Sequence, residues 1–438
     1  MKQSGFFQAL VWLGAVAGLS ACSSDDAILT GTRVPVLTYG NELMPDADLK
    51  KNYLLPEPEN VQAWTQAGGL SHHVMQNPSL GSKIIQAWRI SIGRGGDKRS
   101  VLLAEPVGRN GIVYTIDSAG YVQAVSVAGG KKIWSATLPE KGGSRGIGSI
   151  GTGLALDDTR LFAALGTGEV VALDANNGTE LWRVNLHSPV RSAPTVYGGR
   201  LFVITADNKL TALAQDDGRT LWQHYAFFES LSLMGKAAPA IDKGFGIATF
   251  ASGDVVAFRP ENGSILWTES LGASRLNSAG ADINDIRARP VIAGDKVFVV
   301  SNGGLLSAME LKTGSVIWER EIGGINQPWL AGDMLYVLSS YEELVALEAS
   351  SGKILWVNKL SQWQDPEKKK KRLMWTGPVM AGNRLILINS IGQAIAVAPQ
   401  TGTIIGWDEV DDQGALPPIV LDNTLFFVTE NGKLIAYR

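Results

Sequence analysis

Short apolar segments alternate with turn residues along most of the chain. From about residue 81 onward, apolar runs such as residues 201–204 (LFVI) are separated by pairs such as Asn177-Gly178 and Asp217-Gly218. Short apolar runs bounded by Asn-Gly or Asp-Gly are typical of strands joined by tight hairpins, because glycine accepts the positive φ of such turns. The pattern therefore predicts an all-β fold built from antiparallel hairpins.

These hairpins recur in a repeat. An alanine is followed six positions later by glycine and ten positions later by tryptophan, and the spacing between successive alanines leaves room for four strands, which is typical of propeller blades. The sets are Ala124, Gly130, Trp134; Ala172, Gly178, Trp182; Ala212, Gly218, Trp222; Ala257, Gly263, Trp267; Ala308, Gly314, Trp318; and Ala346, Gly352, Trp356. A seventh set, Ala396, Gly402 and Trp407, is stretched by one residue, and an eighth begins at Ala436. We expect the tryptophans to pack as apolar wedges between neighbouring sheets.

The eighth set lacks a tryptophan strand of its own, and residues 86–90 (QAWRI), around Trp88, look like a tryptophan strand with no unit before them. Joining these two halves gives one composite blade and protects the sheet edges. The sequence therefore predicts an eight-bladed β-propeller over residues 81–438. Its blades are four-stranded and antiparallel, and the ring is closed by pairing the N-terminal and C-terminal strands.

The first residues have the pattern of a secretory signal. A polar start with Lys2 leads into an apolar run that is too short to span a membrane, and the run ends in Leu19-Ser20-Ala21-Cys22. The single cysteine of the chain is then the lipidated residue, and residues 1–21 are the signal peptide. Residues 22–80 contain no repeat, and we interpret them as a lipidated tether or extension. The sequence does not decide whether the part around Trp64 packs on the ring.

Composition excludes several function classes. The formal net charge is −3, so nucleic-acid binding is not expected. The four histidines show no metal-ligand spacing, and His72 and His73 are expected to be solvated within the N-terminal extension. No phosphate loop or His-Glu-x-x-His is present. We therefore expect no catalysis, no cofactor and no metal.

Long connections interrupt the repeat at residues 139–152, 227–236, 272–289 and 361–375. Loops on a rigid scaffold often carry function. The last of these connections contains a charge run, residues 367–372 (EKKKKR). It is either a solvated loop or a contact for an acidic partner or anionic lipid head groups.

With its lipidation box and its repeat, the chain resembles the BamB-type lipoproteins of the outer-membrane β-barrel assembly machinery, within the quinoprotein-like propeller superfamily. Residues 229–239 (ESLSLMGKAAP) are similar to the family's Ser-Leu-Ser-Leu-Arg-Gly loop, and residues 282–287 (DINDIR) are similar to its acidic loop. The resemblance implies contacts with the periplasmic POTRA domains of the barrel-forming subunit through Leu231, Leu233, Met234, Asp285 and Arg287. Met234 stands where the family usually has arginine, and Arg287 where it has a second aspartate.

Three hypotheses follow. The chain is a non-catalytic scaffold of that machinery, anchored by its lipid at the periplasmic face of the outer membrane. Alternatively, it is a propeller that binds unfolded outer-membrane proteins or another envelope partner. The third hypothesis is a pyrroloquinoline-quinone-dependent dehydrogenase, which the absence of the adjacent cysteine pair found in many such enzymes disfavours.

Overall fold

The computed structural model describes residues 43–46, 53–97, 100–138, 151–227, 235, 237–272, 285–410, 412–414 and 416–438, with only the backbone of Trp407. Residues Leu43–Arg438 form one compact unit. Every regular element among the described residues is a β-strand. None of these residues belongs to a helix of the length and hydropathy that crossing a membrane would need.

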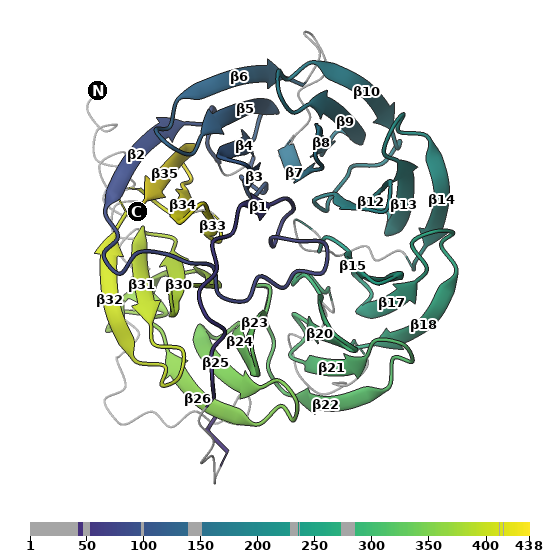
Figure 1. Cartoon of the computed structure of the whole chain (residues 1–438). Helices are drawn as coiled ribbons and strands as arrows, with labels where there is room; N and C mark the ends of the chain where they lie inside the picture. Colours follow the sequence, from purple (N-terminus) through teal and green to yellow (C-terminus); the bar gives the residue numbers. More distant parts are fainter. Residues whose placement is uncertain are drawn as a thin grey trace, which may run out of the picture. The chain divides into compact units, whose positions relative to one another are not determined.

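Eight antiparallel sheets stand around a common axis, which confirms the predicted eight-bladed propeller (Figure 1). Each of the first four blades comprises four consecutive strands, listed from the axis outward: blade 1 is β3 (Val107–Arg109), β4 (Ile112–Ile116), β5 (Tyr121–Ser126) and β6 (Lys132–Thr137); blade 2 is β7 (Gly151–Leu156), β8 (Arg160–Leu165), β9 (Glu169–Asp174) and β10 (Glu180–Asn185); blade 3 is β11 (Thr195–Tyr197), β12 (Arg200–Ile204), β13 (Lys209–Ala214) and β14 (Thr220–Tyr225); blade 4 is β15 (Ala240–Asp242), β16 (Phe245–Thr249), β17 (Asp254–Phe258) and β18 (Ile265–Ser270).

The remaining blades continue the ring in the same order: blade 5 is β19 (Val291–Ala293), β20 (Lys296–Val300), β21 (Leu306–Glu310) and β22 (Val316–Arg320); blade 6 is β23 (Trp329–Ala331), β24 (Met334–Leu338), β25 (Glu343–Glu348) and β26 (Ile354–Lys359); blade 7 is β29 (Trp375–Ala381), β30 (Arg384–Asn389), β31 (Gln393–Val397) and β32 (Ile404–Glu409); blade 8 is β33 (Ile419–Leu421), β34 (Thr424–Val428), β35 (Lys433–Tyr437) and β2 (Gln86–Ser91). Two further pieces lie outside this scheme. Strand β1 (Ala63–Trp64) adds a fifth strand to blade 1, and β27 (Trp363–Asp365) and β28 (Lys370–Arg372) form a separate hairpin.

The inner strands are buried on both faces because each blade is stacked between two neighbours. In β12, for example, Leu201, Phe202, Val203 and Ile204 all have no exposed surface. This explains why these strands are continuous apolar runs in the sequence. The outer strands alternate exposed and partly buried positions, since one of their faces meets solvent.

The tryptophans of the repeat occupy one position in seven blades. Each stands opposite the repeat alanine in the strand register, at the pairs Ala124↔Trp134, Ala172↔Trp182, Ala212↔Trp222, Ala257↔Trp267, Ala308↔Trp318, Ala346↔Trp356 and Ala436↔Trp88. The indole Nε1 donates to a backbone carbonyl of the next blade; Trp134, for example, donates to Ala175 O at 2.8 Å. The ring covers that blade's hairpin glycine, so a Cβ at Gly178 would lie 2.5 Å from Trp134 Cε3. The indoles therefore join adjacent blades by apolar contact and a hydrogen bond.

Blade 7 departs from this register. Gly406, and not Trp407, stands opposite Ala396, and Trp407 pairs with Ile395. We expected the stretched seventh set to place Trp407 at the wedge position. In the other blades the residue four positions after the hairpin glycine stands opposite the alanine. The same count from Gly402 reaches Gly406, so Trp407 lies one position beyond the wedge position.

The ring closes as predicted. Strand β2 pairs with β35, and Trp88 lies opposite Ala436. Trp88 Nε1 donates to Val127 O of blade 1 at 3.0 Å, and Ile85 and Arg438 exchange backbone hydrogen bonds at 2.7 and 3.0 Å. The composite blade thus makes the same contacts as a blade formed from one continuous segment.

Residues 53–80, the N-terminal segment, pack on the propeller instead of forming a free tether. Within this segment, residues 62–78 cross the mouth of the ring, and residues 61–78 hydrogen-bond to every blade (Figure 1). The blade residues whose backbone N–H groups donate these bonds are Asn110, Leu156, Val196, Ile241, Ile292, Gly332, Gly382 and Asp422. Trp64 is 1% exposed and stacks on Trp329 with ring centroids 6.3 Å apart. The compact unit therefore begins well before residue 81, the predicted start of the propeller.

The expectation for His73 was wrong. Its side chain is 2% exposed, and Nδ1 lies 2.7 Å from Pro290 O. Burial, together with the nearby Arg289, lowers the pKa of His73 to about 3. His72 is half-buried, and desolvation lowers its pKa as well. Both histidines therefore belong to the packed segment.

Candidate functional site

A cavity of about 310 Å³ lies on the ring axis and is lined by residues from all eight blades. Most blades have a proline just before the inner strand, or within it in blade 7, and the residue before that proline lines a cavity at the axis. These residues are Glu105, Ala193, Ala238, Arg289, Gln327, Gly377 and Pro417, the last two lining a smaller adjoining cavity of about 20 Å³. The residue before proline is restricted to extended backbone, which fixes how the chain enters the blade. The axis is thus surrounded by repeated positions with different side chains.

Three of these positions carry polar side chains, and they bond to one another. Arg289 of blade 5 donates from Nη2 to Glu105 Oε1 of blade 1 at 2.7 Å, and from Nε to Gln327 Oε1 of blade 6 at 2.6 Å. The N-terminal segment completes the network, because Gly68 N donates to Glu105 Oε2 at 3.2 Å and Gln327 Nε2 donates to His73 O at 3.0 Å. The network therefore fixes the segment over the axis.

Arg287 lines the same cavity. Its side chain is half-buried, and this burial is the largest effect on its pKa and lowers it. The Asp285 carboxylate opposes the shift and Arg289 adds to it, so that the pKa of Arg287 is lowered overall. Arg191 of blade 3 also lines the cavity. A positive charge in a partly desolvated position binds an incoming carboxylate more strongly than a charge in free solvent.

Asp285 is fully buried, with 0% exposed surface. Its backbone carbonyl accepts a hydrogen bond from Asn302 N of blade 5 at 3.3 Å, and the next residue, Ile286, donates to Phe250 O of blade 4. We expected Asp285 to contact a partner directly. Asp285 is instead held between these two blades, and its carboxylate raises the pKa of the neighbouring Arg287.

The other predicted contact residues, Leu231, Leu233 and Met234, lie outside the described residues, as does Cys22. Gly235, which belongs to the same predicted loop, is described. A Cβ at Gly235 would lie 3.7 Å from Arg287 Nε and 3.9 Å from Leu103 Cδ2. The structure thus brings Gly235 next to Arg287, the last residue of the predicted acidic loop, at the axial cavity.

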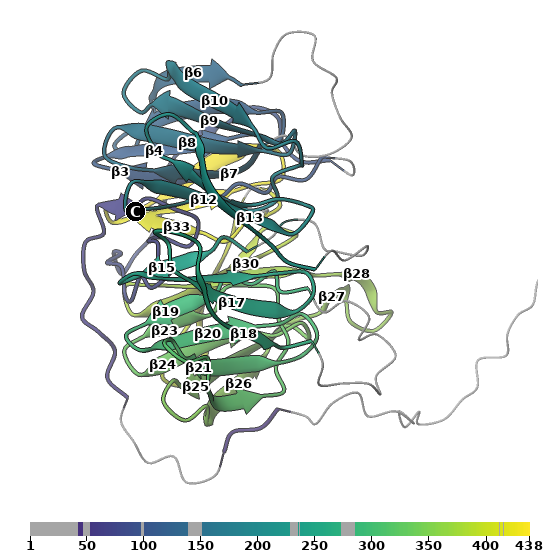
Figure 2. The same cartoon turned by 90° about the vertical axis from the view of Figure 1, so that its right-hand side faces the viewer.

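The basic run forms part of the β27–β28 hairpin, in which Trp363 pairs with Arg372 and Asp365 with Lys370. The hairpin projects from the face opposite the one that the N-terminal segment crosses (Figure 2). Its base reaches the axis, since Trp375 lines the cavity and donates from its backbone N to Glu342 Oε2 at 3.4 Å. Burial raises the pKa of Glu342 to about 7, against the lowering effects of this hydrogen bond and of Arg372. We call this side of the ring the loop face.

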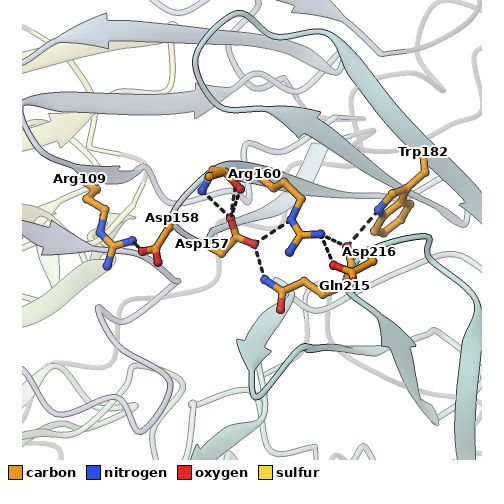
Figure 3. Close-up of polar contacts among 8 residues, drawn as sticks. Arg109, Asp157, Asp158, Arg160, Trp182, Gln215 and Asp216 are labelled. Atoms are coloured by element: carbon orange, nitrogen blue, oxygen red, sulfur yellow. Dashed lines mark hydrogen bonds and ion pairs between the residues drawn. The ribbon is translucent and has the colours of Figure 1, made fainter.

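A second polar cluster joins blades 2 and 3 at the start of β8 and the end of β13 (Figure 3). Arg160 donates to Asp157 at 2.9 Å and to Asp216 at 2.6 Å, and Gln215 O accepts from both Arg160 and Trp182. Burial alone would lower the pKa of Arg160, but the bonds to Asp216 and Asp157 raise it overall. Since its charges are mutually paired, the cluster stabilises the blade junction.

Comparison with known proteins identifies the family. The family model described as outer membrane protein assembly factor BamB matches residues 118–358. The chain belongs to the BamB family. A relative from Yersinia pestis with that name is 27% identical over 361 residues, which cover 80% of this chain and 88% of the relative.

Solved structures show the same fold. The crystal structure of BamB from Moraxella catarrhalis aligns with a TM-score of 0.69 at 20% identity, covering 81% of this chain and 100% of that one. The quinohemoprotein alcohol dehydrogenase from Comamonas testosteroni aligns with a TM-score of 0.65 at 14% identity, covering 86% of this chain and 80% of the enzyme. At these identities the likeness establishes the propeller fold and no activity.

The described residues around the axial cavity of this BamB-family chain do not form a calcium site. Calcium takes six to eight oxygen ligands. Of the carboxylates that line the cavity, Glu105 is bonded to Arg289 and Gly68, and Glu430 is exposed. The described residues contain no group of three acidic, histidine or cysteine side chains placed to hold a metal.

The axial network of this BamB-family chain was not among the features predicted from the sequence. Glu105, Arg289 and Gln327 each precede a blade-opening proline, and this pattern is visible in the sequence. It predicts that they share the axis, but not which of the residues at these positions bond to one another.

Proposed function

We propose that this chain is a non-catalytic scaffold lipoprotein of the outer-membrane β-barrel assembly machinery. In this proposal Cys22 carries the lipid, the ring lies at the periplasmic face of the outer membrane, and the loop face binds the POTRA domains of the barrel-forming subunit. Membership of the BamB family and the names of its relatives as outer membrane assembly factors support the assembly role.

The observation that carries the proposed site is the approach of Gly235 to Arg287, with 3.7 Å between a Cβ at Gly235 and Arg287 Nε. Gly235 and Arg287 are 52 residues apart in the chain, and both line the axial cavity, which supports a single surface formed by the two segments. The proposal needs this proximity, because one POTRA domain can contact both segments only if they adjoin.

Each residue has a separate role in this surface. Leu231 and Leu233 are one residue apart and supply apolar anchors, which contribute strongly when they enter a partner's groove. Met234 extends the apolar contact. Arg287 pairs with a carboxylate of the partner. Asp285 favours the charged form of Arg287 from its buried position and does not itself touch the partner.

Co-purification from mildly solubilised outer membrane tests the site. Leu231→Glu with Leu233→Glu should remove the barrel-forming subunit from the purified material, and Arg287→Glu should weaken its recovery. The matched control is Leu181→Glu with Leu266→Glu, which changes two exposed leucines on outer strands. Association that survives the first double variant, or that is lost equally in the control, would show that the surface lies elsewhere.

The anchor and the absence of catalysis are tested separately. Cys22→Ser should release the chain from the membrane fraction, while leaving the propeller folded. Reduction of an electron-accepting dye by the full chain, with pyrroloquinoline quinone, calcium and an alcohol added, would contradict a non-catalytic role. Recovery of unfolded outer-membrane proteins or a different envelope protein, without the barrel-forming subunit, would favour those partners instead.

A further inference from the structure

The junction between blades 7 and 8 lacks the aromatic pair that most other junctions contain. In blades 1, 2, 3, 5, 6 and 8, a tyrosine or phenylalanine and a tryptophan stand on either side of the repeat alanine. In blade 7 the corresponding row is Ile386, Ala396 and Gly406. The outer strand of blade 7 therefore has a glycine at the position where seven other blades have a tryptophan.

This substitution leaves a cavity of about 440 Å³. Blade 7 lines it with Ile386, Ala396 and Gly406, and blade 8 lines it with Leu425, Phe427 and Tyr437. The exposure of the repeat alanines differs between blade 7 and the other blades. The other seven repeat alanines are all 0% exposed, whereas Ala396 is half-buried.

Ring closure explains why the gap is at this junction. Elsewhere the indole rests on the glycine of the hairpin between the third and fourth strands of the next blade, as Trp356 rests on Gly402. In blade 8 those two strands are β35 and β2, which are distant in the chain and have no hairpin between them. Residues Ser82 and Ile84 border the cavity in its place. An indole from blade 7 would therefore have no turn glycine to cover.

We propose that this cavity binds an aromatic side chain from an extended segment of a partner polypeptide. The other junctions of this ring show what such a space accepts, because in seven of them an indole fills it between apolar side chains. Arg384 on the wall favours an aromatic ring over an aliphatic one, since a guanidinium attracts the negative face of a π-system. Its Nη atoms donate to Ser82 O and Gly81 O, and its buried Nε has no acceptor among the described residues.

A polypeptide fits this position better than a free small molecule. Strand β32 is the edge of its sheet, and its Ile405, which is 55% exposed, borders the cavity. A partner strand that pairs with β32 opposite Gly406 would direct its side chain to the same face as Gly406. The ring would then lie over Ala396, where the outer-strand tryptophan lies in other blades.

Titration of the full chain with blocked peptides tests this site. The probes are acetyl-Thr-Val-Trp-Val-Thr-amide, the same peptide with leucine in place of tryptophan, and free indole, with binding followed by calorimetry. We expect the tryptophan peptide to bind at least about tenfold more tightly than the leucine peptide. A tenfold difference in Kd corresponds to about 1.4 kcal/mol, and the binding free energy gained by burying an indole exceeds that amount. Gly406→Trp places an indole in the cavity and should abolish this binding.

The matched control is Gly129→Trp, which adds the same side chain at an exposed turn where a Cβ would meet nothing within 4 Å. It should bind as the wild type does. Ala396→Leu obstructs the cavity from the neighbouring strand, and it decides the question if Gly406→Trp does not fold. Equal binding of both peptides, no binding of either, or binding unchanged in both cavity variants overturns the proposal. Binding of free indole without the peptide preference overturns the polypeptide occupant.

Discussion

Glu105 and Arg289 form an ion pair of 2.7 Å across the ring axis, although they are 184 positions apart in the chain. They enter from blades 1 and 5, which lie on opposite sides of an eight-bladed ring. Glu105 is 7% exposed, and its second oxygen accepts from Gly68 of the N-terminal segment. This pair therefore connects two opposite blades and the segment that crosses them.

Breaking the axial pair should destabilise the protein strongly. Arg289→Ala leaves the Glu105 carboxylate buried without its cation, which typically costs about 3–5 kcal/mol. Replacing both residues by leucine should cost less than the sum of the single changes, because no charge is then left unpaired. Urea unfolding measures these changes. Arg94→Ala is the control, since the Arg94–Asp97 pair is solvent-exposed and such pairs contribute at most about 1 kcal/mol. An equal loss of stability in Arg289→Ala and Arg94→Ala would contradict this prediction.

The contact between each indole and the next hairpin glycine can be isolated by a pair of substitutions. Gly178→Ala and Gly111→Ala impose the same backbone strain, because both glycines have a φ of +77°. Only at Gly178 would the Cβ meet a ring, 2.5 Å from Trp134, whereas at Gly111 nothing lies within 4 Å. Gly178→Ala should therefore lower the free energy of unfolding by about 1–3 kcal/mol more than Gly111→Ala. Equal losses of stability in the two variants would mean that the Trp134 ring moves aside without cost.

Buried His73 should make the protein sensitive to acid. Its pKa is lowered to about 3 in the folded chain, whereas the unfolded chain takes up the proton near 6.5. The stability that neutral His73 contributes is thus complete above pH 6.5 and is lost as the pH falls toward 3. His73→Asn tolerates the same positive φ and should reduce the loss between pH 6.5 and 4.5 by about 2–3 kcal/mol.

The control for this prediction is His187→Asn. His187 also has a positive φ, 59°, but it is exposed. Urea midpoints of the three proteins across this pH range give the comparison. An acid response of His73→Asn that matches that of the wild type would assign the sensitivity to other groups.

The stability that Glu342 contributes should depend on pH in the opposite direction. Its pKa is raised from 4.5 to about 7 by burial, so the folded chain holds the proton more tightly than the unfolded chain. Its contribution is therefore complete below pH 4.5 and is lost as the pH rises through 7. Glu342→Gln should gain on the order of 3 kcal/mol relative to the wild type between pH 4.5 and 8. Glu367→Gln, at an exposed position of the nearby hairpin, should show no such gain in urea unfolding, and a gain as large there would refute the assignment.

The interblade wedges and the closure of the ring could be predicted because they repeat. One spacing of alanine, glycine and tryptophan recurs along the chain, and each repeat buries its faces against neighbours of the same kind. Trp88 could be assigned to Ala436 from the missing half of one repeat. In blade 7, by contrast, we expected the wedge at Trp407, which lies one residue beyond the usual spacing. The strand register keeps the usual count of ten residues from Ala396 and places Gly406 opposite the alanine.

The number of blades, their order and the way the ring closes can be predicted from the sequence, because they follow from local periodicity and from which repeat is incomplete. The contacts at the axis, by contrast, depend on the tertiary structure. It buried His73 and Asp285, paired Glu105 with Arg289, and placed Gly235 beside Arg287. These contacts join segments that no repeat relates. The geometry of the whole ring decides which residues meet in these contacts, and the sequence of one segment does not indicate what lies across the axis from it.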